Sequence, residues 1–179
     1  MFGTAIKYGA ISGALIIGVL VTGITISNGE HGNGHIFSSV WFGYLVMLLA
    51  LSTIFIAIRE HRSRLGGVIK FLPALGLGLL IALIAAVAYV IGWEFYLNAT
   101  GHQFMNAYVA QMIEAKRAAG VSGAELDHFV AEMEAMTMNY ANPLYRLPMT
   151  FVEIFPVGVL IALISAAALR NPKVLPARG

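Results

Sequence analysis

The sequence has no cysteine and few charged residues, and these two shortages exclude several classes of protein. Without cysteine, the chain forms neither a disulfide scaffold nor a thiolate metal site. Only 11% of the 179 residues are charged and 59% are hydrophobic, whereas soluble domains are about a quarter charged and about 45–50% apolar. The apolar composition also excludes intrinsic disorder. The net charge of +2 is too small to indicate nucleic-acid binding, so an integral membrane protein is the class that remains.

Four apolar stretches are long enough to cross a bilayer, which takes roughly 20 mainly apolar residues. Acidic side chains occur in only two of them, as Glu94 near the end of the third and Glu153 in the fourth. The sequence therefore predicts an all-α fold, an integral membrane four-helix bundle. The first stretch resembles a signal peptide but has no clear cleavage site, so we interpret it as a retained span. The four stretches are residues 5–27, 37–58, 71–96 and 147–169.

Basic residues are concentrated in segments that would lie on one side of this bundle. Such segments usually stay in the cytoplasm. We therefore expect both termini and the loop around residues 59–70 to be cytoplasmic, with the other two connections on the outer side. Four residues of that loop are also candidates for contact with anionic lipid headgroups, namely Arg59, Arg62, Arg64 and Lys70. Eight of the eleven basic residues lie on this side: these four with Lys7, Arg170, Lys173 and Arg178.

About fifty residues between the third and fourth spans are too polar for the membrane. Two apolar stripes at helical spacing predict a helical hairpin over about residues 102–142. Gly120 suits the left-handed end of the first helix, and Ser122 with Glu125 fits a capping box that begins the second. Asn142-Pro143 predicts the end of the second helix. The stripes must pack against each other, the mouth of the bundle or the lipid interface.

Methionine and histidine side chains in the hairpin raise the question of a metal site. Thioethers are soft ligands that suit Cu(I). Most of these methionines lie on the apolar stripes, where methionine commonly fills gaps, so packing is the preferred interpretation and no metal or cofactor is predicted. The histidines of the glycine-rich segment at residues 30–35 are interpreted as part of a turn. The hairpin residues concerned are Met105, Met112, Met133, Met136, Met138, His102 and His128.

Glu153 is the residue with the strongest physical reason for a functional role. An ionisable side chain inside a membrane is costly and usually marks a specific polar contact or a functional site. Pro156, three residues later, predicts a helix kink that frees a backbone carbonyl. Glu94 falls in the same half of the membrane, so the two carboxylates are candidates for binding an ion or sharing a proton. The alternative is structural, with Glu153 hydrogen-bonded to a neighbouring helix and Glu94 among the headgroups.

Two further patterns concern helix packing. Gly9 and Gly13 form a GxxxG pattern, which predicts a close helix contact within the chain or between two copies. Residues 78–86 and 158–166 have nearly the same sequence, GLLIALIAA and GVLIALISA. Inverted repeats are typical of transporters. Because only one span matches and its residues are common in all membrane helices, we interpret the similarity as chance.

An ordered set of short motifs covers nearly the whole chain. With these motifs the chain resembles the bacterial membrane proteins grouped as domain of unknown function 4199. The resemblance implies a four-span protein of the bacterial inner membrane, and it implies no established activity, substrate or catalytic residue. The motifs are Lys7-Tyr8-Gly9, Ile11-Ser12-Gly13, GYLVMLLALS at 43–52, Leu65-Gly66-Gly67, Trp93-Glu94, Ala131-Glu132-Met133-Glu134, Asn142-Pro143-Leu144 and TFVEIFPVG at 150–158.

These features predict a function only as a class. The sequence has no nucleophile–base pattern, phosphate-binding loop or zinc-helix motif, which favours a non-enzymatic accessory, assembly or interaction subunit. Its partner surfaces would be the hairpin and the small-sided first span. Its partners would be membrane lipids, other membrane proteins or a second copy, without nucleic acid. The alternatives are a small transporter or proton-coupled permeation protein that uses Glu153 and Glu94, and a lipid-modifying membrane enzyme.

Overall fold

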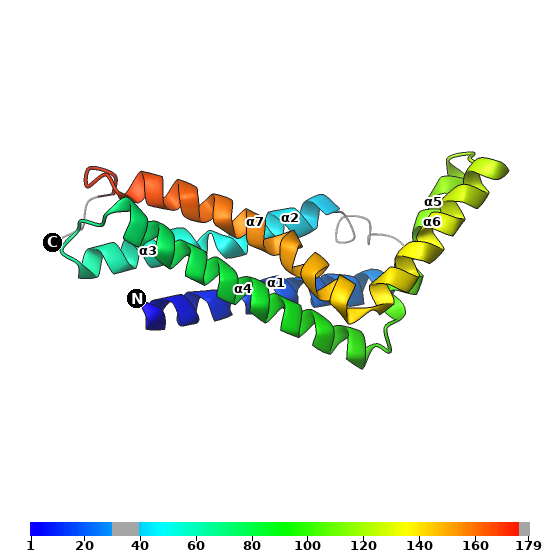
Figure 1. The fold of residues 1–179 in the computed structure, drawn as a ribbon, viewed down its shortest axis with the longest axis horizontal. Helices are drawn as coiled ribbons and strands as arrows, with labels where there is room; N and C mark the ends of the chain where they lie inside the picture. The colour runs from blue at the N-terminus through cyan, green and yellow to red at the C-terminus, as the bar shows by residue number, and fades with distance from the viewer. Residues whose placement is uncertain (30–39, 176–179) are drawn as a thin grey trace. The chain divides into compact units, whose positions relative to one another are not determined.

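The structure, a computed structural model, describes residues 1–29 and 40–175, in which there are helices and no strands. The predicted all-α fold is therefore confirmed. The chain divides into two compact units, unit 1 with Met1–Gly92 and Phe151–Gly179, and unit 2 with Trp93–Thr150. The segment interpreted as a turn at residues 30–35 lies outside the described residues. The helices are α1 (Phe2–Gly29), α2 (Val40–Leu51), α3 (Thr53–Arg64), α4 (Phe71–Ala99), α5 (Gln103–Ala118), α6 (Ala124–Ala141) and α7 (Pro143–Leu169) (Figure 1).

Four helical stretches are long and apolar enough to cross a membrane, and they overlap the four predicted spans. They are Phe2–Thr25, Trp41–Arg64, Phe71–Ala99 and Pro143–Leu169, the second of which combines α2 and α3. The fourth begins earlier than expected, because the Leu144 N–H donates a hydrogen bond to Asn142 Oδ1 at 3.0 Å and caps α7. Pro143 then occupies the first helical position, where its missing N–H is not needed. Since α6 ends at Ala141, Asn142-Pro143 does end the preceding helix, as predicted.

The glycines of α1 pack against α4. A Cβ atom on Gly9 would lie 2.7 Å from Cβ of Ile84, and one on Gly13 would lie 2.6 Å from Cβ of Ala88. Both distances are far below van der Waals contact, so only glycine permits this approach. The small side of α1 is therefore used inside the chain, and these two glycines are not available to a partner.

Polar side chains next to these glycines connect α1 to α3. Tyr8 Oη donates a hydrogen bond to Glu60 Oε2 at 2.5 Å, and the hydroxyls of Ser12 and Thr53 are hydrogen-bonded to each other. Ser12 is fully buried, so its hydroxyl needs such a partner. In both motifs of α1, Tyr8-Gly9 and Ser12-Gly13, the first residue thus forms a polar contact with α3 and the glycine after it packs against α4.

The two similar runs of α4 and α7 lie against each other. A Cβ atom on Gly78 would lie 2.7 Å from Cβ of Ala162, and one on Gly158 would lie 2.6 Å from Cβ of Ala82. The two runs pack against each other as an antiparallel pair, with the glycine of each facing the alanine of the other. Small residues allow membrane helices to approach closely. The glycine and alanine of each run therefore serve this contact, and the interpretation of the overall similarity as chance remains untested.

We expect Gly78→Val to destabilise the protein by about 1–3 kcal/mol, the usual range for overpacking a core. Gly76→Val is the matched control, because it lies two residues away on α4 and a Cβ there would meet nothing within 4 Å. Thermal unfolding in detergent micelles measures the difference. Equal melting temperatures for the two variants would contradict the α4–α7 contact.

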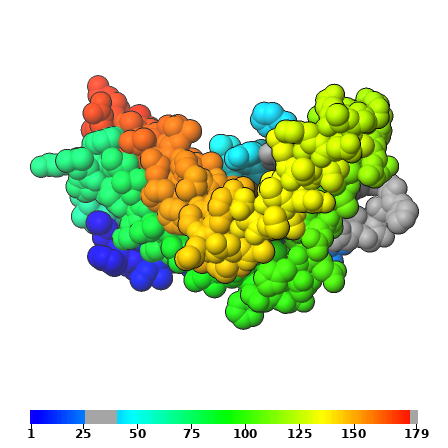
Figure 2. All heavy atoms as spheres, turned by 45° about the vertical axis from the view of Figure 1, so that its right-hand side comes forward, coloured from blue at the N-terminus to red at the C-terminus, as the bar shows by residue number. Residues whose placement is uncertain are grey.

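The helix α7 also packs beside α2. Leu51 Cδ2 lies 3.9 Å from the Cβ position of Gly158, and the two helices are neighbours within unit 1 (Figure 1). Both also contribute to the surface of unit 1, where α7 is orange and α2 is cyan (Figure 2). Their exposed faces therefore belong to one side of this unit.

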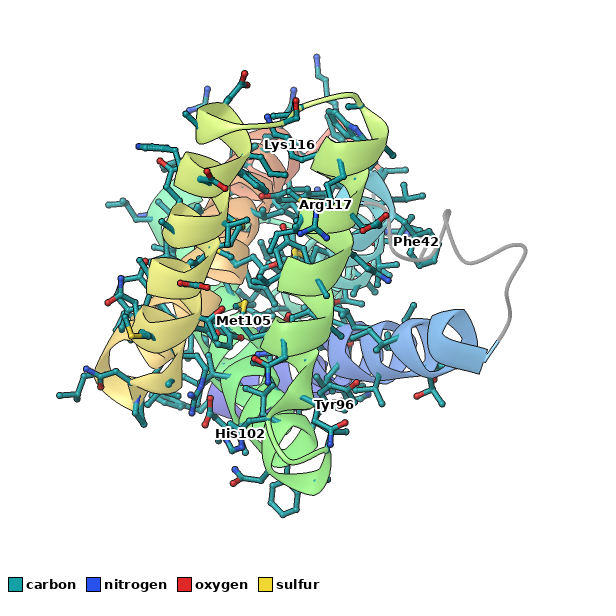
Figure 3. All side chains as sticks on the ribbon, turned by 90° about the vertical axis from the view of Figure 1, so that its right-hand side faces the viewer. Phe42, Tyr96, His102, Met105, Lys116 and Arg117 are labelled. Carbon is teal, nitrogen blue, oxygen red and sulfur yellow. The ribbon has the colours of Figure 1, made fainter. Side chains whose placement is uncertain are left out.

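Unit 2 contains the predicted hairpin of α5 and α6, whose helices pack on each other (Figure 3). Met105 and Val109 of α5 are buried. Gly120, with φ of 85°, ends α5 as predicted, and the hydrogen bond from Val121 N to Lys116 O at 3.2 Å completes a Schellman motif. Mutual packing therefore accounts for part of both apolar stripes.

The predicted capping box at the start of α6 is wrong. The helix begins at Ala124, and the residue before it is Gly123, which provides no side-chain cap. Gly123 has φ of 65°, a conformation that suits glycine and separates Ser122 from the helix by one residue. Ser122 is consequently one position too early to cap α6.

Candidate functional site

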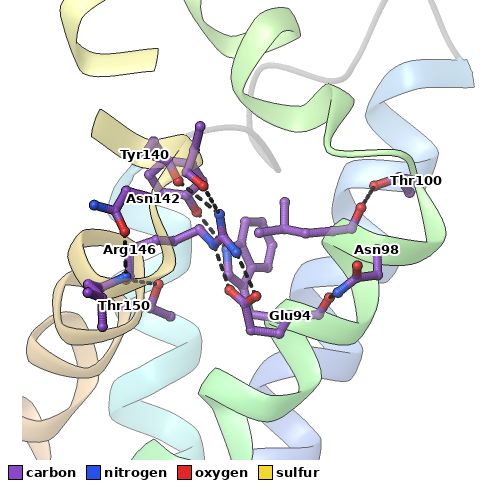
Figure 4. A network of polar contacts seen from close by, with 11 residues as sticks. Glu94, Asn98, Thr100, Tyr140, Asn142, Arg146 and Thr150 are labelled. Atoms are coloured by element: carbon purple, nitrogen blue, oxygen red, sulfur yellow. Dashed lines mark hydrogen bonds and ion pairs between the residues drawn. The ribbon is translucent and has the colours of Figure 1, made fainter. Parts of the chain in front are cut away.

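A group of charged and polar side chains surrounds Arg146 near the start of α7 (Figure 4). Arg146 Nε donates to Glu94 Oε1 at 2.6 Å, and Arg146 Nη2 donates to Glu94 Oε2 at 2.7 Å. The side chain of Arg146 is 4% exposed and that of Glu94 is 24% exposed. Paired hydrogen bonds between a guanidinium and a carboxylate are strong and fix the geometry of both groups. Glu94 is thus held by a cation within unit 2.

Arg146 also binds the end of α6. Its Nη1 donates to the carbonyl oxygen of Tyr140 at 2.9 Å and to that of Ala141 at 3.4 Å. The last carbonyls of a helix have no partner inside it and carry partial negative charge. One guanidinium therefore joins the last turns of α4, the end of α6 and the first turns of α7. We call this set of contacts the Arg146 clasp.

Aromatic side chains extend the clasp to the start of α5. Trp93 Nε1 donates to Tyr140 Oη at 2.7 Å. The Trp93 ring meets Phe104 edge-on, with centroids 4.9 Å apart, and stacks on Tyr96 at 5.3 Å. Such pairs are typically worth about 0.5–1.5 kcal/mol beyond the area that they bury. The base of the hairpin is accordingly held by both charged and aromatic contacts.

The sequence contains a signal for the Glu94–Arg146 pair that depends on helix register. Twelve residues separate Ala82 from Glu94 on α4, and twelve separate Arg146 from Gly158 on α7. Since Ala82 and Gly158 are in contact, counting in opposite directions along the two helices leads to the ion pair. Without that contact, Arg146 and Glu94 are two charges near helix ends with no evident partner.

Glu153 lies in unit 1, on the exposed side of α7. Among the described residues, its carboxylate has no hydrogen-bond or ion-pair partner. Val152 and Leu160 on the same side are 61% and 57% exposed. The helix continues through Pro156, and the kink expected there remains a prediction, as does a proton shared with Glu94. Glu153 is therefore a single carboxylate on an apolar surface of a candidate span.

Arg62 differs from the other basic residues of its segment. Its side chain is fully buried, whereas Arg59, Arg64 and Lys70 are exposed. Arg62 Nη1 donates to the carbonyl oxygens of Leu169 at 3.2 Å and Val174 at 2.9 Å, and Nη2 donates to that of Leu175. Arg62 Nε has no acceptor among the described residues. In this arrangement Arg62 binds the end of α7 and the residues after it. Contact of the other three side chains with lipid headgroups remains a prediction.

The residues considered for Cu(I) are distributed over the hairpin. Met105 is buried, Met112 is 37% exposed and Met138 is 72% exposed. His128 Nδ1 lies 3.7 Å from Glu132 Oε1. Within the described residues, no three His, Asp or Glu side chains form a group that suits a metal ion. The Cu(I) hypothesis, which also involves His102, Met133 and Met136, remains a prediction.

The Arg146 clasp and Glu153 differ in whether their polar groups have partners. In the Arg146 clasp, a cation, a carboxylate and two helix-end carbonyls satisfy each other, and the same guanidinium lies 5.7 Å from the Tyr140 ring. A satisfied buried pair of this kind fixes structure, and breaking it is costly. Glu153, in contrast, offers an acceptor to a group that approaches from outside.

Comparisons with known proteins identify a family and no characterised relative. Residues 7–171 match the family described as "Protein of unknown function (DUF4199)". No curated protein matches the chain, and no solved structure matches it.

Proposed function

The chain belongs to the DUF4199 family of proteins of unknown function, and we propose that it is a membrane-anchored, non-enzymatic interaction subunit that binds a partner protein through the α5–α6 hairpin. One observation carries the proposal. The Arg146 clasp fixes the base of a hairpin in which α6, 18 residues long, has no fully buried residue. A helix normally buries its apolar side against another element. A hairpin with a fixed base and an incompletely buried helix is suited to binding a partner protein through that helix.

The chemistry of α6 indicates what this partner would present. Glu125, Asp127 and Glu134 are exposed and form no ion pair with a described residue. Met138 on the same helix is 72% exposed, and methionine adapts well to varied apolar surfaces. We therefore propose a partner with a basic surface and an adjoining apolar contact.

We propose that the protein lies in the inner membrane of a bacterial cell. In the proposed orientation, the basic end of unit 1 faces the cytoplasm. The N-terminus, the connection from α3 to α4 and the end of α7 lie at the same end of unit 1 (Figure 1). Segments with many basic residues usually remain cytoplasmic. The hairpin would then be reached from the outer side, because three candidate spans precede it in the sequence. Six exposed basic residues support this orientation: Lys7, Arg59, Arg64, Lys70, Arg170 and Lys173.

Neutralising the acidic side of α6 is expected to release the partner. The variant combines Asp127→Asn and Glu134→Gln, and it removes two negative charges that share one side of α6 and would face a basic surface. We expect at least a tenfold loss of co-purified partner from native membranes in a mild detergent, which corresponds to about 1.4 kcal/mol. Quantitative mass spectrometry of the purified complex measures the loss.

A matched control changes the net charge equally on the other helix. It combines Asn106→Lys and Gln111→Lys, two exposed positions of α5. The control should retain the partner. Equal loss in both variants would show a non-specific effect of net charge, and unchanged recovery in both would contradict binding through α6.

A further inference from the structure

The exposed side of α7 has a feature that lipid does not satisfy. Glu153 has no partner among the described residues, and Val152 and Leu160 beside it are exposed and apolar. Hydrocarbon offers no hydrogen-bond donor, so a carboxylate at this depth is costly unless another protein group binds it. The side of α7 that carries Glu153 therefore requires a donor from outside unit 1.

Two contacts define which residues of α2 and α3 lie at the depth of Glu153. Leu51 lies against Gly158, and Arg62 is bonded to the carbonyl of Leu169. In each pair the two residue numbers differ by the same amount, so the helices run in the same direction in one register. By this register Glu153 is level with Val46.

The exposed side of α2 carries a donor close to that level. Tyr44 is two residues from Val46, roughly 3 Å along the helix, and its side chain is 47% exposed. Its hydroxyl has no partner among the described residues, although such hydroxyls normally find one when they are buried. Leu45 and Leu48 surround it and are each 52% exposed. The chain thus carries an unsatisfied acceptor and an unsatisfied donor at similar depth on neighbouring helices.

We infer that a second copy of this chain packs on the side of unit 1 formed by α2 and α7, and that Tyr44 of each copy donates to Glu153 of the other. A two-fold axis along the membrane normal leaves every residue at its own depth. Because α2 and α7 are parallel neighbours, this axis brings α2 of each copy to α7 of the other. Such an interface is closed and self-complementary, as in most dimers. The inference does not depend on the role of the hairpin.

Cysteine cross-linking tests the inference in native membranes, because the chain has no cysteine of its own. Two differently tagged copies are produced together, one with Leu45→Cys and the other with Val152→Cys. These residues are level with each other by the α2–α7 register and are both exposed. After mild oxidation we expect a product that carries both tags. The control pair replaces Leu45→Cys by Leu15→Cys, on α1 and 48% exposed, and should give at least fivefold less product.

Variants of the two polar groups separate a specific contact from chance proximity. Glu153→Leu and Tyr44→Phe, each added to the cross-linking pair, should lower the yield severalfold. Glu153→Gln should keep most of it, because the amide oxygen still accepts a hydrogen bond. A yield no higher than that of the control pair would overturn the inference. A product with another protein in place of the second tag, or a yield unaffected by Glu153→Leu and Tyr44→Phe, would overturn it as well.

Discussion

Replacing Arg146 with methionine is expected to destabilise the protein by about 3–5 kcal/mol, the usual cost of removing one partner of a buried ion pair. The variant removes both bonds to Glu94 and the bonds to the end of α6. It leaves the Glu94 carboxylate without a cation at a site that is only 24% exposed. The base of the hairpin should loosen, because one guanidinium holds all three helices there. Thermal unfolding and limited proteolysis of the hairpin measure these two effects.

Two further variants show whether the unpaired charge is the cause. Glu94→Gln added to Arg146→Met should recover part of the lost stability, because no buried charge then lacks a partner. Arg64→Met is the control for losing an arginine–glutamate pair, since Arg64 and Glu60 form one at a side chain that is 64% exposed. Exposed pairs of this kind are typically worth about 0–1 kcal/mol. A similar loss from Arg64→Met and Arg146→Met would contradict the structural role of the clasp.

Replacing Arg62 with methionine should produce the second-largest effect, a loss of about 3 kcal/mol in the free energy of unfolding. Hydrogen bonds from charged donors are worth about 1.5–3 kcal/mol each. Part of their loss is offset because the variant no longer buries a charge. Arg62 binds carbonyls of Leu169, Val174 and Leu175. Without it, the end of α7 loses a favourable cation and the following residues lose their attachment. Faster protease cleavage after Leu169 should accompany the fall in melting temperature.

The control for Arg62 is its exposed neighbour. Arg59→Met should change stability by less than about 0.5 kcal/mol, the usual limit for surface substitutions. Arg62→Lys should rescue little, because one ammonium group cannot replace a planar fork that reaches separate carbonyls. Full stability in Arg62→Lys, or equal losses in Arg62→Met and Arg59→Met, would contradict the proposed attachment of the C-terminal segment.

The four spans and the hairpin were accessible from the sequence because they depend on local patterns. A long apolar run can satisfy its backbone only as a helix in a membrane, and the apolar stripes of α5 and α6 repeat at helical spacing. The position of Gly120 was predictable for the same reason, since the turn requires a left-handed residue. Local signals failed at Ser122, where Gly123 took the position before the helix.

The candidate sites were less accessible because they depend on which helices meet and in what register. The partner of Glu94 depends on the register between α4 and α7, which is not a local property of either helix. Arg62 looked like its basic neighbours, because its burial depends on residues more than a hundred positions later in the chain. Likewise, the GxxxG pattern of Gly9 and Gly13 does not reveal that α4 is the helix that packs against it, because this depends on how the helices assemble. Transport through Glu153 and lipid modification remain predictions from the sequence.

Site-specific photo-cross-linking on α6 tests the central proposal, binding through the hairpin, most directly. A photoreactive amino acid at Ala131, exposed on α6, is activated in intact membranes, and the products are identified by mass spectrometry. The account predicts a discrete cross-link to one protein, which is also the protein that co-purifies and is lost when the acidic residues of α6 are neutralised. The same group at Gln111 on α5 should give little of that product. No protein cross-link at Ala131, or equal cross-linking at Gln111, would contradict the proposal.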